Sequence, residues 1–240
     1  MGAESKRLFL LAGLASVPVG ATQPVEKIQP GIYTNEEEVY FDTLAKRPAA
    51  KWTSITVESY AEGELVTFVD AFGKPFMFAP APSTYTARPK SAERLEIAFQ
   101  NGRTTELRRA RRVSCWVAIR KDKPKADGTE DWYFARDVRL HDQGGRAMVG
   151  GDDSGAPQVM IRVRNVTWDK GSTNAPVVAL YIHKPDNWDK AESYSWAAPD
   201  SARVGINLRW VQAGCTIEGI GAPSSLNSDN FKSNEEAKAQ

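Results

Sequence analysis

The feature that most constrains this chain is an alternation of apolar and polar residues that recurs along most of its length. Successive side chains of an extended strand point to opposite faces, so this period of two predicts strands that bury one face. No segment shows the sustained i, i+3, i+4 apolar spacing of an amphipathic helix. The alternating runs occupy residues 55–57, 66–68, 95–99, 113–119, 132–140, 159–163, 178–182 and 204–210. The sequence therefore predicts an all-β protein.

Turn residues separate these runs. Many short strands joined by turns that contain glycine and proline are typical of a sandwich or a closed barrel. We expect an antiparallel β-sandwich, with a closed, calyx-like β-barrel as the alternative. The chain of 240 residues is 41% hydrophobic and 10% aromatic, which suffices for a sizeable core. Since no repeat or low-complexity linker interrupts residues 22–222, we expect them to form a single β-rich domain.

One hairpin can be predicted in detail, around Gly102. A two-residue turn would mix the apolar and polar faces of the flanking strands. A three-residue loop with Gly102 in the left-handed conformation instead pairs Leu95 with Leu107 and Ile97 with Thr105. We predict the second register, because it keeps the apolar side chains together.

The N-terminus has the pattern of a secretory signal peptide. Lys6 and Arg7 precede an apolar run at residues 8–15, and small residues follow as far as Ala21. The run is shorter than the roughly 20 apolar residues that a membrane-spanning helix needs. The alternative is a buried N-terminal helix. We expect residues 1–21 to be removed and the mature protein, without a transmembrane segment, to be periplasmic or secreted. We expect the polar residues 223–240 to be a disordered tail.

The chain has two cysteines, Cys115 and Cys215. In an oxidising compartment the simplest state of two thiols is one disulfide. The alternation places Cys115 on the apolar face of its strand, beside Val113 and Val117. A catalytic thiol is the alternative, but no histidine or basic pocket lies near either cysteine in the sequence.

The charges nearly balance, with 31 Lys and Arg residues against 30 Asp and Glu residues. A dedicated nucleic-acid binder usually has a basic excess, so we expect no nucleic-acid partner. Nine basic residues nevertheless gather between positions 103 and 125. This basic cluster could contact an anionic glycan, lipid headgroups or an acidic partner. We favour the alternatives, protection of a sheet edge or ordinary surface.

The strand at residues 132–141 carries an arginine in an otherwise apolar row. Its even-numbered side chains are Trp132, Phe134, Arg136, Val138 and Leu140. A guanidinium buried in such a row needs a carboxylate or a ligand anion as its partner.

A candidate binding surface would form if this strand and the strand that begins at residue 178 were neighbours. It would combine Arg136, Asp137, His141, Tyr181 and His183. Such a surface suits a glycan, because aromatic faces stack on sugar rings and charged groups hold hydroxyls or uronates. The alternative is the solvated face of an amphipathic sheet. Independently, Trp188 and Trp196 stand in a polar, loop-like segment, which makes them further ligand-binding candidates.

Metal and catalytic motifs are weak. With two histidines in the chain, a zinc site of three or four His and Cys ligands is almost excluded, and we expect no cofactor. The acidic loops at residues 127–131 and 152–154 offer oxygens for calcium, without the spacing of an EF-hand. Residues 151–157 resemble the nucleophile loop of chymotrypsin-like serine proteases. The upstream histidine, His141, lies thirteen residues before Ser154, too close for that family, so we interpret the segment as a turn.

Two functional hypotheses remain. The first is a non-catalytic envelope or periplasmic protein that binds a glycan, lipid or protein partner through a sheet face or aromatic loops. The alternative is a carbohydrate-active enzyme, a polysaccharide hydrolase or lyase. Such an enzyme could use His141 or His183 together with Tyr133 or Tyr181 for proton transfer.

Overall fold

The predicted strands pair into three antiparallel sheets. The computed structural model describes residues 27–61, 63–76, 84–169 and 171–220, so the predicted signal peptide and polar tail lie outside the described residues. The N-terminal sheet has the order β3-β2-β1-β6-β5-β4. Its strands are β1 (Gly31–Thr34), β2 (Ser54–Tyr60), β3 (Gly63–Phe68), β4 (Tyr85–Ser91), β5 (Arg94–Phe99) and β6 (Thr104–Ala110).

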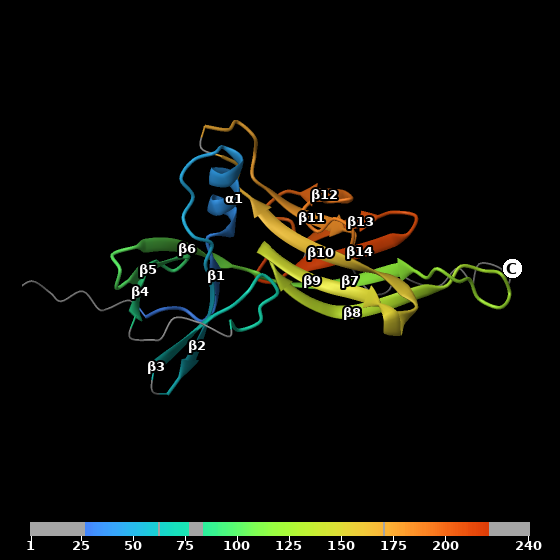
Figure 1. Cartoon of the computed structure of the whole chain (residues 1–240), viewed down its shortest axis with the longest axis horizontal. Coiled ribbons are helices and arrows are strands. Elements are labelled where there is room, and N and C mark those ends of the chain that lie inside the picture. The colour runs from blue at the N-terminus through green and yellow to red at the C-terminus, as the bar shows by residue number, and fades with distance from the viewer. Residues whose placement is uncertain (1–26, 62, 77–83, 170, 221–240) are drawn as a thin grey trace, which may run out of the picture.

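The other two sheets have four strands each. Sheet I has the order β12-β11-β10-β9 and contains β9 (Gln143–Gly151), β10 (Ala156–Val166), β11 (Val177–His183) and β12 (Ser193–Ala197). Sheet II has the order β13-β14-β7-β8 and contains β7 (Arg112–Arg120), β8 (Trp132–His141), β13 (Arg203–Asn207) and β14 (Val211–Ile217). Figure 1 shows these two sheets at one end of the molecule and the N-terminal sheet at the other.

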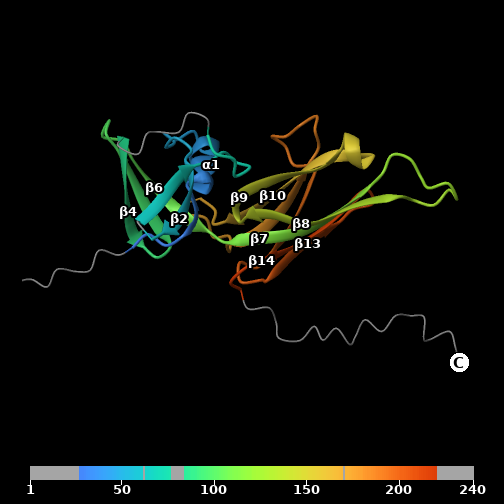
Figure 2. The same ribbon diagram turned by 90° about the horizontal axis from the view of Figure 1, so that it is seen from below.

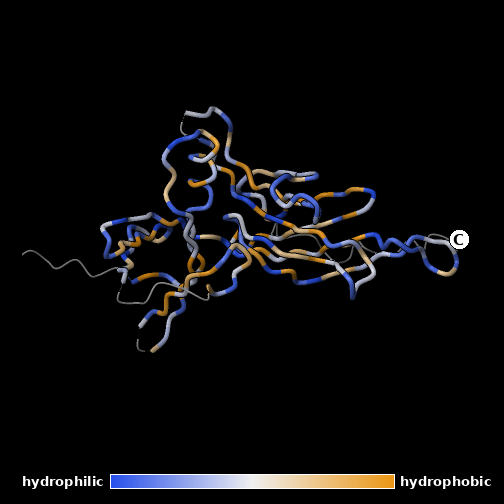
Figure 3. The backbone as a smooth tube through the Cα atoms, in the orientation of Figure 1, coloured by the Kyte–Doolittle hydropathy of each residue, from blue (hydrophilic) through white to orange (hydrophobic). Residues whose placement is uncertain are grey.

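Sheets I and II pack face to face around one hydrophobic core. Figure 3 shows hydrophobic and hydrophilic stretches of backbone along these strands. Alternate residues, such as Val159, Ile161 and Val163 of β10, are buried in the core. From β7 and β14 the buried residues are Val113, Cys115, Val117, Ile119, Val211, Ala213, Cys215 and Ile217. The prediction of an all-β antiparallel sandwich is therefore confirmed.

The predicted disulfide is also present. Cys115 and Cys215 are bonded to each other, and they occupy directly opposite positions on β7 and β14. Both side chains are buried in the core between the sheets. The bridge joins residues 100 positions apart in sequence and so constrains the unfolded chain, which in the loop-entropy account stabilises the fold by several kcal/mol (about 4–5).

The N-terminal sheet is a half-barrel that encloses a second hydrophobic cluster. Its fully buried side chains include Tyr33, Ile55, Leu95, Ile97 and Leu107. One residue, Arg111, separates β6 from β7, so the chain passes directly from this sheet into sheet II (Figure 2). The predicted hairpin register is confirmed, because Leu95 pairs with Leu107 and Ile97 pairs with Thr105.

The expectation that no segment is helical is wrong at one place. Residues 36–44 form helix α1 (Glu36–Leu44), which begins with three glutamates. Acidic side chains in a first turn interact favourably with the positive end of the helix dipole. The buried residues of this helix are Glu36 and Glu37 rather than apolar ones, so the spacing of apolar residues could not reveal it.

The apolar row predicted for residues 132–140 is also only partly right. Two residues of β8, Arg136 and Asp137, lie opposite a single residue of β7, and Asp137 has a φ of 54°. This β-bulge shifts the phase of the strand. Consequently Tyr133 and Ala135 face the core before the bulge and Val138 faces it afterwards, while Arg136 is exposed rather than buried.

The basic cluster between residues 103 and 125 does not protect a sheet edge. Strand β6 lies between β1 and β5, and β7 lies between β14 and β8. Its members are thus distributed from the N-terminal sheet across β7 to the loop that follows. Among the described residues, no helix is long and apolar enough to cross a membrane.

Candidate functional site

The outer face of sheet II carries exposed aromatic residues beside a groove. Because the core-facing residues of each strand alternate with outward-facing ones, the strand register defines rows of outward side chains across the sheet. One row contains Asn207, Gln212, Ala118 and Phe134. The next contains Gly205, Gly214 and Trp116, and a third contains Arg203, Thr216, Ser114 and Arg139.

Three aromatic residues line one shallow depression on this face, and we call them the platform: Trp116, Trp132 and Phe134. The rings of Trp116 and Phe134 stack, with centroids 5.9 Å apart and an interplanar angle of 23°. Both are exposed, at 41% and 48%. The guanidinium of Arg136 lies 5.2 Å from the centroid of the Phe134 ring. Exposed aromatic side chains that cluster in this way mark a contact surface for a partner.

A groove of about 680 Å³ runs beside the platform. Its floor includes Gly205 and Gly214, and the indole of Trp116 lies directly over Gly214. A Cβ atom at position 214 would come within 2.5 Å of Trp116 Nε1, so glycine at this position allows the indole to lie against the backbone. The remaining lining includes the polar side chains Arg203, Asn207, Gln212 and Thr216.

The same face ends in a cationic cavity of about 330 Å³ beside the N-terminal sheet. Three arginines line it, Arg112, Arg139 and Arg146, together with Glu218 and His141. Apolar residues from the N-terminal half, including Phe72, complete the lining. His141 is buried, and its Nδ1 has no hydrogen-bond partner among the described residues. Burial, and to a lesser degree the charge of Arg146, lowers its pKa to about 4, so His141 is neutral at physiological pH.

The structure does not bring the five predicted site residues together. Arg136, Asp137 and His141 lie on β8 in sheet II, whereas Tyr181 and His183 lie on β11 in sheet I. The prediction depended on these two strands being neighbours, and they belong to opposite layers of the sandwich. The histidine–tyrosine combinations that span the two strands, His141 with Tyr181 and His183 with Tyr133, are therefore separated, whereas Tyr181 and His183 lie on one strand with ring centroids 6.4 Å apart.

Sheet I has a different outer face. Tyr181 and Tyr194 are directly opposite on β11 and β12, with ring centroids 5.8 Å apart. Trp196 is 65% exposed on β12, while Trp188 is partly buried in the loop before this strand. His183 is buried on β11, and burial lowers its pKa. Burial raises the pKa of Tyr181.

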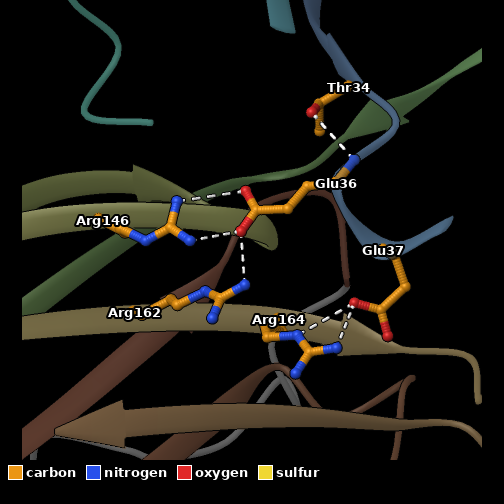
Figure 4. A network of polar contacts seen from close by, with 6 residues as sticks. All are labelled: Thr34, Glu36, Glu37, Arg146, Arg162 and Arg164. Carbon is orange, nitrogen blue, oxygen red and sulfur yellow. Dashed lines mark hydrogen bonds and ion pairs between the residues drawn. The ribbon is translucent and has the colours of Figure 1, made fainter. Parts of the chain in front are cut away.

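Helix α1 lies against part of this face and is attached to it by ion pairs. Arg146 of β9 and Arg162 of β10 both contact Glu36, and Arg164 of β10 contacts Glu37 (Figure 4). Because these arginines have carboxylate partners within the protein, we interpret this cluster as the attachment of the helix to sheet I.

The segment that resembles a protease nucleophile loop is a turn. Residues Asp152–Ser154 form one turn of 3-10 helix, and Ser154 Oγ donates to the carbonyl of Gly151 and accepts from the Ala156 amide. The part of the chain that the structure describes holds no group of three or more His, Cys, Asp or Glu side chains arranged to bind a metal ion.

No family model, curated protein or solved structure matches this chain. Function therefore has to be inferred from the geometry of the outer face of sheet II.

The platform residues were not among the predicted site residues, although the sequence contains a signal for one of them. Trp116 occupies an even position in a strand whose odd positions are apolar, so the alternation places it on the outer face. An aromatic residue on the polar face of an amphipathic strand is a usable signal. Phe134 could not be found in this way, because the bulge after it reverses the apparent phase of β8.

Proposed function

We propose that this protein is an exported, non-catalytic protein that binds a polysaccharide on the outer face of sheet II. The observation that carries this proposal is the exposed stack of Trp116 and Phe134 beside a groove with a glycine floor. The apolar C–H faces of sugar rings pack on aromatic rings, and the remaining hydroxyls need hydrogen-bonding partners. Asn207, Gln212 and Thr216 supply amide and hydroxyl groups along the groove.

The rigidity of the sheet supports binding of an extended ligand. The platform residues belong to the two neighbouring strands β7 and β8, and the Cys115–Cys215 bridge joins β7 to β14 beneath the groove. A preformed surface loses little conformational entropy when it binds, so modest contacts suffice for measurable affinity. The signal-peptide pattern and the disulfide support a periplasmic or extracellular location.

Titration calorimetry with a panel of soluble neutral and anionic polysaccharides tests the proposal. We expect Trp116→Ala to weaken binding about tenfold or more, because one aromatic stacking contact is lost. Trp196→Ala is the matched control, since this tryptophan is also exposed but lies on sheet I. Loss of binding in Trp196→Ala with Trp116→Ala unaffected would place the site on sheet I. Absence of binding to every polysaccharide would contradict the proposal.

The same samples address the enzymatic alternative. Release of new reducing ends or unsaturated sugars from a bound polysaccharide would show turnover. If His141→Gln or His183→Gln abolished that turnover, the protein would be a carbohydrate-active enzyme rather than a binding protein.

A further inference from the structure

We infer that the polysaccharide bound by sheet II is anionic, with carboxylate or sulfate groups that bind to unpaired arginines on the same face. This inference rests on the proposed function and specifies its ligand class. Arg120, on the same face as the platform, pairs with Glu130. Four other arginines on this face form no ion pair among the described residues: Arg112, Arg136, Arg139 and Arg203. All four are exposed.

The strand register places these arginines in a defined arrangement. Arg139 and Arg203 end the row that follows the Trp116 row, and Arg112 lies opposite His141 in the row after that. Arg112 is four residues from Trp116 along β7, which is about 13 Å of extended strand. A polysaccharide that stacks on the platform and continues toward the N-terminal sheet would thus pass between Arg203 and Arg139 before it reaches Arg112.

These arginines have no ionic partner among the described residues. Neighbouring arginines that serve the fold do have one: Arg111 pairs with Asp142, and Arg146 pairs with Glu36. Apart from Arg120 and Glu130, whose charges cancel in their ion pair, these four arginines compare with the carboxylates of Asp137 on β8 and Glu218 beside the cavity. The face therefore has an excess of positive charge, although the chain as a whole is almost neutral.

Two of the four arginines line the cationic cavity, which could hold an anionic group. Arg112 and Arg139 line it together with Arg146, and apolar residues of the N-terminal half, Ile32 and Phe72, contribute to the lining. Guanidinium groups bind carboxylate and sulfate through paired, charge-assisted hydrogen bonds, which are shorter and stronger than neutral ones. The geometry thus suits an acidic sugar at the end of the groove nearest the N-terminal sheet.

Matched polysaccharides separate charge from sugar stacking. The probes are polygalacturonate and its fully methyl-esterified form, and dextran sulfate and dextran. We expect the wild-type protein to bind an anionic member at least about tenfold more tightly than its neutral counterpart at low salt, with the difference falling as salt rises. Preference for polygalacturonate alone would assign carboxylates, and preference for dextran sulfate alone would assign sulfates. Both results support the inference.

The variant Arg112→Gln/Arg139→Gln tests the assigned residues. It is expected to lose about tenfold or more in affinity for the anionic probe and less than about twofold for the neutral one. Arg88→Gln/Arg108→Gln removes two charges from the N-terminal sheet and is expected to change neither affinity. Circular dichroism and urea titration verify that both variants are folded.

Each contrary outcome has a distinct meaning. Equal binding of neutral and anionic probes, abolished by Trp116→Ala and unaffected in Arg112→Gln/Arg139→Gln, overturns the anionic inference and leaves polysaccharide binding intact. Equal losses in the two double variants also overturn it, because net charge alone would then explain the preference. Anionic binding that Trp116→Ala does not weaken overturns the proposed platform itself.

Discussion

Glu37 of helix α1 and Arg164 of β10 form a buried ion pair, although 127 positions separate them in the chain. Nε and Nη2 of Arg164 lie 3.0 and 2.8 Å from Glu37 Oε2. The guanidinium carbon also lies 3.9 Å from the centroid of the Tyr40 ring. Burial raises the pKa of Glu37, and Arg164 opposes that rise. The helix is therefore attached to sheet I through charges that have lost most of their water.

Glu37→Gln is expected to destabilise the protein by about 3 kcal/mol, because it leaves the buried Arg164 without its counter-charge. Urea unfolding at pH 7 measures the change. Arg47→Gln is the control, since Arg47 forms ion pairs with Asp42 and Asp169 in an exposed position, and we expect it to cost at most about 1 kcal/mol. Similar losses in the two variants would show that burial of the Glu37 pair does not matter.

Gly144→Ala is expected to cost more stability than Gly128→Ala. Both glycines have a positive φ, 88° and 82°, so an alanine is strained by about 1–2 kcal/mol at either position. At position 144 the new Cβ would also overlap Glu36 Oε2, whereas nothing lies within 4 Å at position 128. The extra loss of unfolding free energy in Gly144→Ala, relative to Gly128→Ala, measures the cost of disturbing the contact between β9 and α1. Equal values would mean that the helix moves aside without cost.

Stability is expected to fall as pH decreases from about 6.5 toward 4, because His141 titrates in the unfolded chain before it titrates in the folded one. The folded pKa is about 4, so the unfolded state binds the proton first. By pH 5 the loss amounts to about 2 kcal/mol. Asp142 and Glu37, whose pKa values burial raises, contribute with the opposite sign. The contribution of His141 is therefore the difference in slope between the wild type and His141→Gln in urea titrations from pH 8 to pH 5. Parallel curves would exclude this account.

Gly214→Ala is expected to displace the Trp116 indole and weaken polysaccharide binding with a small loss of stability. The new Cβ would lie 2.5 Å from Trp116 Nε1, and the exposed indole can rotate away from it. Near-ultraviolet circular dichroism reports the changed tryptophan environment, and calorimetry reports the affinity. Thr86→Ala, at an exposed position of β4 in the N-terminal sheet, is the control that should leave both signals unchanged. Unchanged binding in Gly214→Ala would indicate that the position of the indole is not critical.

Local patterns predicted those parts of the fold in which the decisive contacts are short-range or apolar. Leu95 and Leu107 belong to one hairpin, so the turn at Gly102 and the need to keep apolar residues together sufficed to set their register. Cys115 and Cys215 are the chain's two cysteines, which left one pairing available.

Local patterns were insufficient where charged residues are buried and where a β-bulge shifts the alternation of a strand. Helix α1 was missed because it buries Glu36 and Glu37, and a pattern of apolar residues contains no trace of buried carboxylates. The outer face of β8 was assigned incorrectly because the bulge at Asp137 shifts the alternation by one residue. Asp137 does not share a surface with Tyr181 and His183, because β8 and β11 belong to different sheets. Local sequence patterns do not determine which strands become neighbours.

The sequence by itself determined that this chain forms strands, which face of most strands is apolar, and that its two cysteines could form a bridge. These properties follow from side-chain alternation and turn chemistry over a few residues. The tertiary structure decided which strands became neighbours, and therefore which outward side chains share a surface. It placed Trp116 beside Phe134, and it gave Arg164 a carboxylate partner while leaving Arg139 without one among the described residues. Packing and desolvation act between segments that lie far apart in the chain, so no local pattern could predict these outcomes.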